Sequence, residues 1–450
     1  MRYLPHTEAE IREMLDAIGV ASIDALFEPI PEPLRARPLD LEPPLDEAAL
    51  MAHLERLADR NEAAKDLSFL GAGMYDHHIP PAVDQLLLRS EFYTAYTPYQ
   101  GEVSQGTLQA IYEFQTMVCE LFDMDVANAS MYDAASATAE AALMARRVSK
   151  GKRRKIILSG ALHPHAIDTV RTYLAGLDDE PELVVTAVSA DGRTDLESVR
   201  DALGESPAAL VVGYPNFLGC VEDLEALGAA IHDAGGLLIT QTTEPYALSV
   251  LQAPGTAGAD ICVGEGQALA APPQFGGPGV GLFACREKFV RQMPGRLVGE
   301  TVDETGKRCF VLTLSTREQH IRRDRATSNI CTNHGLIALA FCIRTAMLGR
   351  SGFERAGDTC LRAAAYLERE LKGLDGFELP YGAPTFNELV VRRKDGKAAP
   401  MLAALAAQGI LAGVDLGQFD PAWDHDFLVA VTEKHGRADI DRLIEALAST

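Results

Sequence analysis

The sequence predicts an α/β protein whose large domain holds a mostly parallel β-sheet with helices on both faces. Six short, continuous apolar runs lie in the middle of the chain, as expected for strands buried on both sides: KIILSG, LVVTAV, AALVVG, GLLIT, DICVG and VGLFA. Helical patterns such as DLESVRDAL and EDLEALGAAIHDAGG separate several of these runs. Strands that alternate with helices in this way favour crossover connections and therefore a parallel sheet.

Residues 1–70 are predicted to form an N-terminal helical arm. The segments EAEIREMLDAI and DEAALMAHLERLADRN carry apolar residues at helical spacing, and the proline-rich stretch FEPIPEPLRARP separates them. We expect these helices to lie over a neighbouring surface, because the rest of the chain's plan offers their apolar faces little to pack against.

The large domain is expected to span residues 71–335, and a smaller C-terminal α+β domain to span residues 336–450. The pattern changes near residue 335, where two long helical segments follow, GLIALAFCIRTAML and ERAGDTCLRAAAYLEREL. After them come FNELVVRR, GILAGVDL and FLVAVTEKHGRADIDRLIEAL, which mix strand-like and helical patterns.

The composition narrows the class of protein. The chain has 450 residues and a formal net charge of −23, which argues against nucleic acid as a partner, because such binding depends on neutralising phosphates. It is 47% hydrophobic and 23% charged, which is typical of a soluble globular protein. Its longest continuous apolar runs are shorter than ten residues, and the N-terminus does not look like a secretory signal. We therefore expect a cytoplasmic protein that does not enter a membrane.

Eight cysteines are scattered along the chain, and no C-x-x-C pair occurs. Most lie in apolar surroundings such as AFCIR and DICV, which indicates buried, reduced thiols. His77 and His78 follow Tyr75 and Asp76, but no third ligand is near them in the sequence, so an ordinary loop is the simpler interpretation. We expect no metal site.

The stretch 260-DICVGEGQALAAPPQFGGPGVGLFA-284 resembles the region around the cofactor lysine in aspartate-aminotransferase-like enzymes, which use pyridoxal phosphate (PLP). Such a site needs a lysine to bind the cofactor aldehyde and an aspartate to hold the pyridinium nitrogen. It also needs a small-residue turn at a helix N-terminus for the phosphate, and a ring stacked on the pyridine. Yet no lysine lies between Lys155 and Lys288.

Long motifs make the resemblance specific. The segment 93–140, which begins YTAYTPYQGEVSQG, is similar to the N-terminal-half signature of the glycine decarboxylase P-protein family. So are 293-MPGRLVGETVDETGK-307 and 316-TREQHIRRDRATSNICTNHG-335. The resemblance covers essentially the whole chain and is to the α subunit of the form that many bacteria split into two. It implies a PLP-dependent transferase of fold type I, and an α2β2 assembly whose second subunit carries the PLP.

The family's catalytic half has parts that this chain lacks. Its N-x-H-K-T segment precedes a glycine-rich loop, and aligning that loop with Gly276–Gly279 puts Gln267 at the lysine. Its G-G-x-x-x-x-D-G-A segment matches 235-GGLLITQTTEP-245, which puts the neutral Gln241 at the aspartate. Its phosphate turn, S-G-A-x-G, reads ASATA here, at residues 135–139. Only His163, in ALHPHA, matches the ring-stacking histidine.

These losses together predict that the chain holds no catalytic residue and binds no PLP covalently. Taken alone, Gln267 could reflect a sequence error or an unrelated loop, but the lysine, the aspartate and the glycines are lost together. We interpret Gln267, Gln241 and His163 as a degenerate pocket.

Two segments are expected to reach a neighbouring subunit's active site instead. YTAYTPYQ (93–100) places three tyrosines around a proline, although an aromatic patch packed within its own domain is an equal alternative. TREQHIRRDR (316–325) gathers positive charge in an acidic chain, although a solvated helix face with internal ion pairs is the alternative. The residues predicted to be lent to the partner's site are Tyr96, Tyr99, Arg322, Arg323, Thr327, Ser328 and Asn329.

The sequence thus predicts a structural and allosteric α subunit of the P-protein, an oxidoreductase of glycine catabolism. The resemblance implies that the complex with subunit 2 decarboxylates glycine and transfers the aminomethyl group to the lipoyl arm of the H-protein. Two alternatives stay open. One is a self-sufficient PLP enzyme that recruits Lys155, Lys288 or Lys307, and the other is a scaffold protein outside glycine cleavage.

Overall fold

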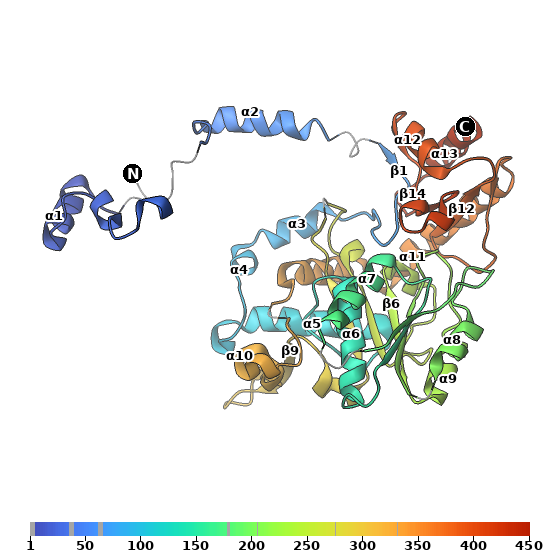
Figure 1. The fold of residues 1–450 in the computed structure, drawn as a ribbon, viewed down its shortest axis with the longest axis horizontal. Helices are drawn as coiled ribbons and strands as arrows, with labels where there is room; N and C mark the ends of the chain where they lie inside the picture. The colour runs from blue at the N-terminus through green and yellow to red at the C-terminus, as the bar shows by residue number, and fades with distance from the viewer. Residues whose placement is uncertain are drawn as a thin grey trace. The chain divides into compact units, whose positions relative to one another are not determined.

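The computed structural model describes residues 5–35, 40–61, 66–177, 181–204, 206–274, 276–330 and 332–450 (Figure 1). The chain divides into two compact units, residues 1–62 and 63–450. Each unit is described by itself.

The first unit contains two α-helices, α1 (Glu8–Ile18) and α2 (Glu47–Ala58), where the sequence predicts them. Thr7 caps α1 through a capping box with Glu10, and Asp46 accepts a backbone N–H at the start of α2. No residue of these two described helices is buried. Large apolar side chains of this unit are exposed: Met14, Ile18, Ile23, Leu26, Phe27, Ile30, Leu34, Leu41, Leu45, Leu50, Met51, Leu54 and Leu57.

The second unit is built on a seven-stranded mixed sheet (Figure 1). In spatial order its strands are β2 (Val126–Ala127), β8 (Gly281–Cys285), β7 (Ile261–Glu265), β6 (Leu237–Thr242), β5 (Pro207–Gly213), β3 (Lys155–Leu158) and β4 (Leu183–Val185). Neighbouring strands from β4 to β7 run parallel, whereas β8 is antiparallel to both β7 and β2. All six predicted strands are present, and the predicted fold class is confirmed.

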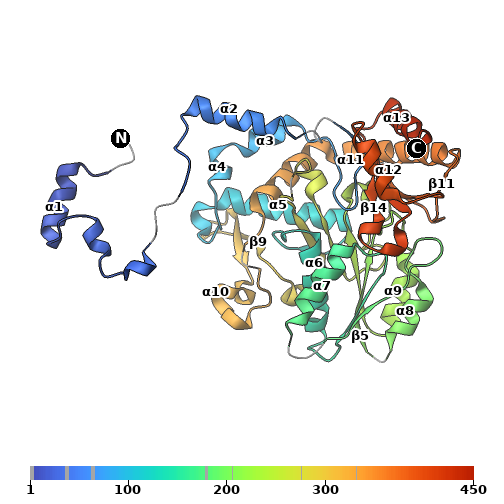
Figure 2. The same cartoon turned by 45° about the horizontal axis from the view of Figure 1, so that its top comes forward.

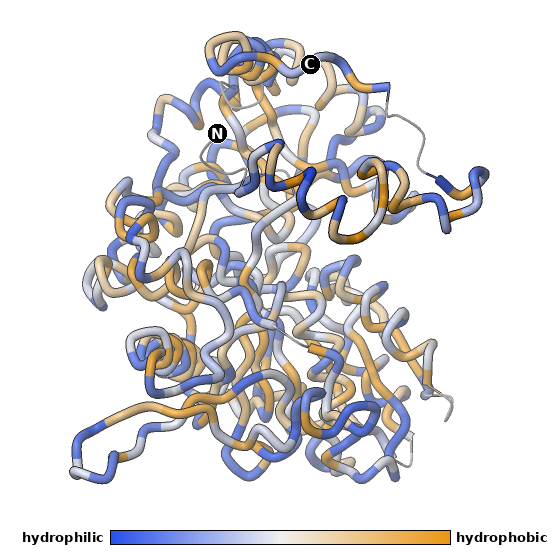
Figure 3. The backbone as a smooth tube through the Cα atoms, turned by 90° about the vertical axis from the view of Figure 1, so that its left-hand side faces the viewer, coloured by the Kyte–Doolittle hydropathy of each residue, from blue (hydrophilic) through white to orange (hydrophobic). Residues whose placement is uncertain are grey.

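Helices cover both faces of this sheet (Figure 2). In β3, Ile156 and Leu158 belong to the core on one face, and Ile157 belongs to the core on the other. Because both faces are covered, the strands are mostly apolar, which explains the continuous apolar runs; Figure 3 colours the chain by hydropathy. The first face carries α6 (Ala134–Val148) and α7 (Pro164–Ala175). The second carries α5 (Gln105–Phe122), α8 (Leu196–Leu203), α9 (Leu224–Asp233) and the first part of α11 (Gly335–Lys372).

The long helix α11 joins two helices that were predicted separately. Its backbone leaves the helical conformation at Gly349, where φ is 56°, so the element is interrupted between its two halves. By length and composition alone α11 could also cross a membrane, a test that the core helix of a soluble protein passes as well. Its first half packs in the core of the large sheet through Phe341, and its second half packs in the C-terminal core through Leu367.

A smaller antiparallel sheet lies in the C-terminal part of the second unit. Phe69 packs in its core, and the short strand β1 (Leu67–Ser68) pairs in parallel with β13 (Ile410–Leu411). The four strands of the sheet, in spatial order, are β11 (Phe377–Glu378), β12 (Glu388–Arg393), β15 (Asp426–Ala430) and β14 (Val414–Asp415). The accompanying helices are α12 (Ala398–Ala406) and α13 (Arg437–Ala448).

A β-hairpin, β9 (Leu297–Val302) and β10 (Arg308–Thr313), was not predicted from the sequence. The Asp303 carboxylate closes its turn by accepting the backbone N–H groups of Thr305 and Lys307. The remaining short helices are α3 (Pro81–Leu87), α4 (Ser90–Tyr93) and α10 (Gln319–Arg322). The 3-10 turns used below are η5 (Pro245–Ser249), η6 (Gln267–Leu269) and η8 (Ser315–Arg317).

Candidate functional site

In open α/β sheets, ligand sites lie at the carboxyl ends of the parallel strands. Here the strands β6 and β7 pack against α6, and Gln241, near the end of β6, contacts the first turn of that helix. Glu265 is the last residue of β7, and Gln267 begins η6 after the single residue Gly266. The structure therefore brings Gln241 and Gln267, both predicted as pocket residues, to one helix end.

The first turn of α6 is capped by the chain itself. The Asp133 carboxylate accepts the Ser136 N–H at 2.7 Å, and the Asp133 N–H donates to the Ser136 hydroxyl at 3.3 Å. Together these bonds form a capping box. The predicted phosphate turn, residues 135–139, therefore lies inside a capped helix.

A second carboxylate, that of Glu265, reaches the same helix end. It accepts backbone N–H groups from Ala134 at 3.1 Å, Gln267 at 3.1 Å and Val280 at 2.8 Å. Burial raises the pKa of Glu265 to about 7, although these hydrogen bonds oppose the rise. In the sequence, Glu265 falls just after the predicted strand DICVG and was assigned no role, so its part in this helix end was missed.

Gln241 is buried, and its amide is fully engaged inside the protein. Its Nε2 donates to the Thr138 hydroxyl at 2.8 Å and lies 3.4 Å from the Ala134 carbonyl oxygen. A neutral amide bonded to a helix turn offers no charge to a pyridinium nitrogen. The geometry thus agrees with the loss of the aspartate at this position.

Gln267 is buried as well, at the start of η6. Its side-chain amide donates to the Ala271 carbonyl, and its backbone N–H donates to Glu265. The side chain therefore closes its own short loop. It has no amine with which a cofactor aldehyde could react.

His163 caps α7 and packs edge-on against Phe217, with ring centroids 4.9 Å apart. Its Nε2 donates to the Ala72 carbonyl at 2.9 Å and its Nδ1 accepts the His165 N–H at 3.1 Å. Burial lowers the pKa of His163 to about 4, so the ring is neutral. Within the described residues, the His163 side chain makes no hydrogen bond to Gln241 or Gln267.

PLP does not fit the residues at this edge. Two carboxylates, from Asp133 and Glu265, hold the N–H groups that a phosphate would need. A methyl group at Gly73 would lie 3.0 Å from the His163 ring and 3.8 Å from Thr243, so the backbone there occupies the space beside the histidine. No lysine stands in this stretch of the sequence.

A buried ionic cluster lies beyond the end of β6. The His77 ring places Nε2 2.9 Å from the Glu244 carboxylate and Nδ1 2.6 Å from the Glu433 carboxylate. Burial would lower the pKa of His77, but the two carboxylates raise it to about 9. The cluster therefore holds an imidazolium between two carboxylates. It joins the segment before α3 to the end of β6 and to the loop after β15.

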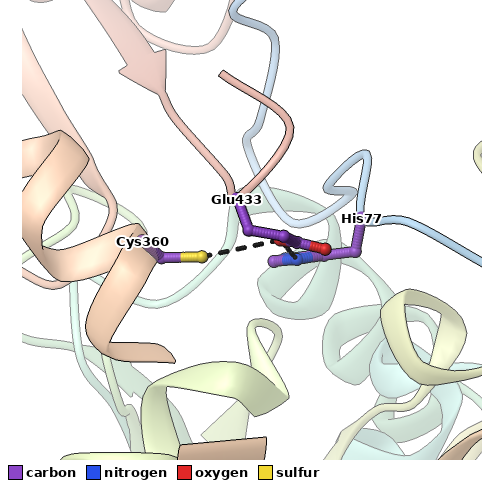
Figure 4. A group of neighbouring side chains, drawn as sticks. All are labelled: His77, Cys360 and Glu433. Atoms are coloured by element: carbon purple, nitrogen blue, oxygen red, sulfur yellow. Dashed lines mark hydrogen bonds and ion pairs between the residues drawn. The ribbon is translucent and has the colours of Figure 1, made fainter. Parts of the chain in front are cut away.

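His77, Cys360 and Glu433 also resemble a set of metal ligands, since their ligand atoms lie within 4.8 Å of one another (Figure 4). However, both ring nitrogens of His77 already bond carboxylates, and the Cys360 thiol lies 3.6 Å from Glu433. The protonated His77 ring thus already supplies the positive charge between the two carboxylates, and neither ring nitrogen has a lone pair left for a metal ion. His77 lies in a loop, as the sequence predicts, but the sequence did not reveal its partners, because 356 residues separate it from Glu433.

The two predicted tyrosines lie on the surface but in different settings. Tyr96 is 84% exposed and lines a groove of about 140 Å³ with Leu336 and Leu339 at the start of α11. Tyr99 is 55% exposed, and its hydroxyl accepts a hydrogen bond from Arg296 at 3.1 Å. Tyr99 packs against His320 and Arg296 of its own chain, so the alternative of a surface aromatic patch packed within its own domain stays open.

The segment 316–325 is not one helix. It consists of η8, the four-residue helix α10 and a further 3-10 turn. Arg317 is buried and donates to the carbonyls of Met293 and Gly295, so its charge is used inside the protein. The alternative of a solvated helix face therefore does not describe Arg317.

Arg322 and Arg323 are exposed. Within the described residues no hydrogen bond or ion pair of their guanidinium groups occurs. His320, on the same short helix, contacts Tyr99 edge-on, with ring centroids 5.4 Å apart. The structure therefore brings the tyrosine segment and the arginine segment side by side.

Thr327, Ser328 and Asn329 lie elsewhere, in a cleft of about 710 Å³ beside α6 and α7. The Ser328 hydroxyl donates to Glu140 at 2.6 Å, and the Thr327 N–H donates to the Arg317 carbonyl at 2.9 Å. Ser328 and Thr327 thus make hydrogen bonds within the chain, whereas Tyr96 is largely exposed. The predicted set of lent residues therefore falls into three surface sites.

Comparison with protein families places the chain clearly. The family model described as "Glycine cleavage system P-protein" matches residues 1–447. A protein of Sorangium cellulosum named "Probable glycine dehydrogenase (decarboxylating) subunit 1" is 58% identical, over 100% of this chain and 99% of that protein. A protein of the same name from Anaeromyxobacter dehalogenans is 51% identical, over 97% of each chain.

Solved structures agree with these relatives. A crystal structure of glycine decarboxylase (P-protein) of the glycine cleavage system, in inhibitor-bound form, superposes with a TM-score of 0.91 at 42% identity, covering 100% of both chains. A sphingosine-1-phosphate lyase from Burkholderia pseudomallei gives a TM-score of 0.69 at 14% identity, covering 92% of this chain and 93% of its own. The second likeness concerns the fold alone, which is that of PLP-dependent enzymes of fold type I.

Proposed function

Since the chain belongs to the glycine cleavage system P-protein family, we propose that it is the non-catalytic α subunit of a two-subunit glycine decarboxylase. The observation that carries this proposal is the set of residues at the carboxyl edge of the large sheet, where the family's cofactor would bind. Gln267 stands at the predicted lysine position, Gln241 stands at the predicted aspartate position, and Asp133 and Glu265 fill the helix end.

The partner is subunit 2, which carries the PLP, in an α2β2 assembly. The relatives' name, which numbers them as subunit 1, supports a second subunit. The exposed apolar faces of α1 and α2 support a neighbour that covers them, because exposing so many large apolar side chains to water is unfavourable. In the cytoplasm the complete complex decarboxylates glycine and passes the aminomethyl group to the lipoyl arm of the H-protein.

The chain's own contribution is to the partner's active site and to the shape of the assembly. Tyr96, Tyr99, Arg322 and Arg323 are exposed, and the arginines keep free hydrogen-bonding capacity. Tyrosine gives a rigid surface with a polar tip, and arginine holds carboxylates and phosphates. Thr327, Ser328 and Asn329 line a separate cleft and contribute shorter polar groups.

The positions of the remote lysines speak against a self-sufficient PLP enzyme. Lys155 begins β3, and its Nζ donates to the Ala202 carbonyl at 3.0 Å. Lys288 follows β8, whose last residue pairs with the first residue of β7. Both lysines therefore lie at the amino edge of the parallel strands, opposite Gln241. Lys307 ends the turn of the β9–β10 hairpin.

The decisive experiment expresses the chain with and without subunit 2 and measures glycine–bicarbonate exchange in the presence of the H-protein. We expect exchange only from the complex, and no near-visible absorbance of lysine-bound PLP from the chain alone. Borohydride reduction with PLP should trap no pyridoxyl-lysine between residues 156 and 287. Exchange by the isolated chain would favour the self-sufficient enzyme. A chain that ignores subunit 2 would favour the scaffold outside glycine cleavage.

A further inference from the structure

Three separate segments converge on the Glu265 carboxylate. Ala134 is the first residue of α6, Gln267 begins η6, and Val280 precedes β8. Their backbone N–H groups reach the two carboxylate oxygens at 3.1, 3.1 and 2.8 Å. Converging N–H groups that include a helix N-terminus form an anion-binding site in proteins. We call these three N–H groups the Glu265 cradle.

The anion in this cradle comes from the chain. Glu265 is buried, 8% exposed, and within the described residues no lysine, arginine or histidine pairs with it. Burying a carboxylate without a cation is costly, and the three N–H groups are what offsets that cost. Gly279 lies so close that a methyl group there would stand 3.1 Å from the carboxylate, so the surrounding loop is fitted to the side chain.

We propose that the Glu265 carboxylate substitutes for the phosphate of the family's cofactor: it occupies the anion site at the start of α6, and without it the cradle binds inorganic phosphate. This inference rests on the proposed function, since it explains how a non-catalytic subunit keeps this helix end folded without a cofactor. Asp133 accepts the Ser136 N–H of the same helix, so the Glu265 cradle is a separate group of N–H donors that an external anion would fill once the carboxylate is removed.

The test uses the full-length chain and the variant Glu265→Ala. Removing the carboxylate leaves three N–H groups without an acceptor, so the melting temperature in phosphate-free buffer falls. Inorganic phosphate should then raise the melting temperature of Glu265→Ala by about 2 °C or more at saturating concentration, through binding to the folded state. The same concentration of phosphate should leave the melting temperature of the unchanged chain the same within experimental error.

A matched control is Glu222→Ala. Glu222 is also a buried carboxylate with a raised pKa, and burial is the main cause. It accepts the Thr194 N–H at 3.0 Å and the Asn216 amide at 2.8 Å, and neither donor belongs to a helix. Glu222→Ala should lose stability like Glu265→Ala but gain nothing from phosphate. Equal phosphate effects on both variants would mean unspecific stabilisation and would overturn the proposal.

If Glu265→Ala does not fold, a second variant, Glu265→Gln, still tests the proposal. Glu265→Gln keeps the volume and one carbonyl acceptor but loses the charge, so hydrogen exchange of the peptide that begins at Ala134 should become faster. Phosphate should not slow it, because the amide still fills the cradle. Unchanged exchange in Glu265→Gln would show that the carboxylate does not hold this helix end, and would overturn the proposal as well.

The same samples separate this inference from the proposed function. If the unchanged chain acquires near-visible absorbance with PLP, the proposed function fails. If it stays colourless and phosphate does not rescue Glu265→Ala, only the present inference fails. Rescue by phosphate in a colourless chain supports both.

Discussion

The carboxyl edge of the large sheet and the surface formed by residues 93–103 and 315–325 use polar side chains in opposite ways. Gln241 and Gln267 are each 2% exposed, and both of their amides bond within the chain. Tyr96 is 84% exposed, and Arg322 and Arg323 have no partner within the described residues. In the first region both glutamine amides are hydrogen-bonded within the chain, although the buried Thr242 hydroxyl has no partner among the described residues. The second region has groups available to another molecule.

Because of this difference, substitutions in the two regions should affect different properties: the stability of the chain in one and the activity of the complex in the other. A change at the satisfied edge leaves buried polar groups without partners, so it should lower the free energy of unfolding. A substitution on the open surface removes few contacts of the folded chain, so it should leave the free energy of unfolding nearly unchanged. Its effect should appear only in the activity of the complex. The following predictions test whether stability and activity divide between the two regions in this way.

The largest effect is expected for His77→Ala. His77 is buried between Glu244 and Glu433, and removing it leaves two carboxylates facing each other with little solvent. Breaking a buried ion pair in this way typically costs about 3–5 kcal/mol of unfolding free energy. Urea unfolding followed by circular dichroism should show this loss. His78→Ala is the control, because His78 is exposed and contributes only its backbone N–H to Glu433.

The same cluster should give the chain a characteristic pH dependence. The pKa of His77 is raised from 6.5 to about 9, so its contribution to stability is complete below pH 6.5 and is lost as the pH rises through 9. Burial opposes the ionisation of Glu433, yet His77 lowers its pKa from 4.5 to about 2. The contribution of Glu433 is therefore present above pH 4.5 and is lost as the pH falls toward 2.

The free energy that separates the unchanged chain from His77→Ala should therefore be largest between pH 4.5 and 6.5, and should shrink above pH 9. Unfolding curves across this range measure it. A difference that is constant with pH would mean that the cluster acts by packing against Tyr246, whose ring lies 4.1 Å from His77, and not by charge.

Sequence patterns predicted the fold well where one physical signal dominated. Six of the seven strands of the large sheet were visible because both of their faces are buried, which makes most of their residues apolar. The β9–β10 hairpin lacks such a run, since β9 passes from buried Leu297 to exposed Val302. The two helices predicted after residue 335 are both present within α11, and the non-helical backbone at Gly349 lies between them.

The candidate site could be predicted only in part. The positions of Gln241 and Gln267 followed from spacing to glycine-rich segments, and both lie at the same helix end. Glu265 could not be recognised, because its donors come from segments as far away as Ala134, 131 residues earlier. Likewise Glu244 is separated from His77 by 167 residues. Tertiary contacts of this kind leave no periodic trace in the sequence.

On the open surface the expected effect is on activity. Tyr99→Phe, or Arg322→Ala with Arg323→Ala, should reduce the exchange activity of the complex by roughly tenfold or more, about 1.4 kcal/mol of transition-state stabilisation. Assembly with subunit 2, measured by size-exclusion chromatography, should survive. Arg350→Ala with Arg362→Ala removes the same charge from exposed positions on α11 and should leave activity unchanged. If both double variants lose activity equally, net charge alone is responsible.

The smallest effect is expected at Gln267. Gln267→Ala removes one buried hydrogen bond, to Ala271, which costs about 1 kcal/mol of stability and should barely change the activity of the complex. Gln267→Lys restores an amine but not the negative charge at Gln241, and it leaves Glu265 and Asp133 in the anion site. The isolated Gln267→Lys chain should therefore show no glycine decarboxylation and no lysine-bound PLP. If Gln267→Ala instead reduces the activity of the complex as much as the tyrosine and arginine variants do, the carboxyl edge of the large sheet would influence the partner's active site. The division between stability and activity would then be wrong, because a region closed to ligands would still control the reaction.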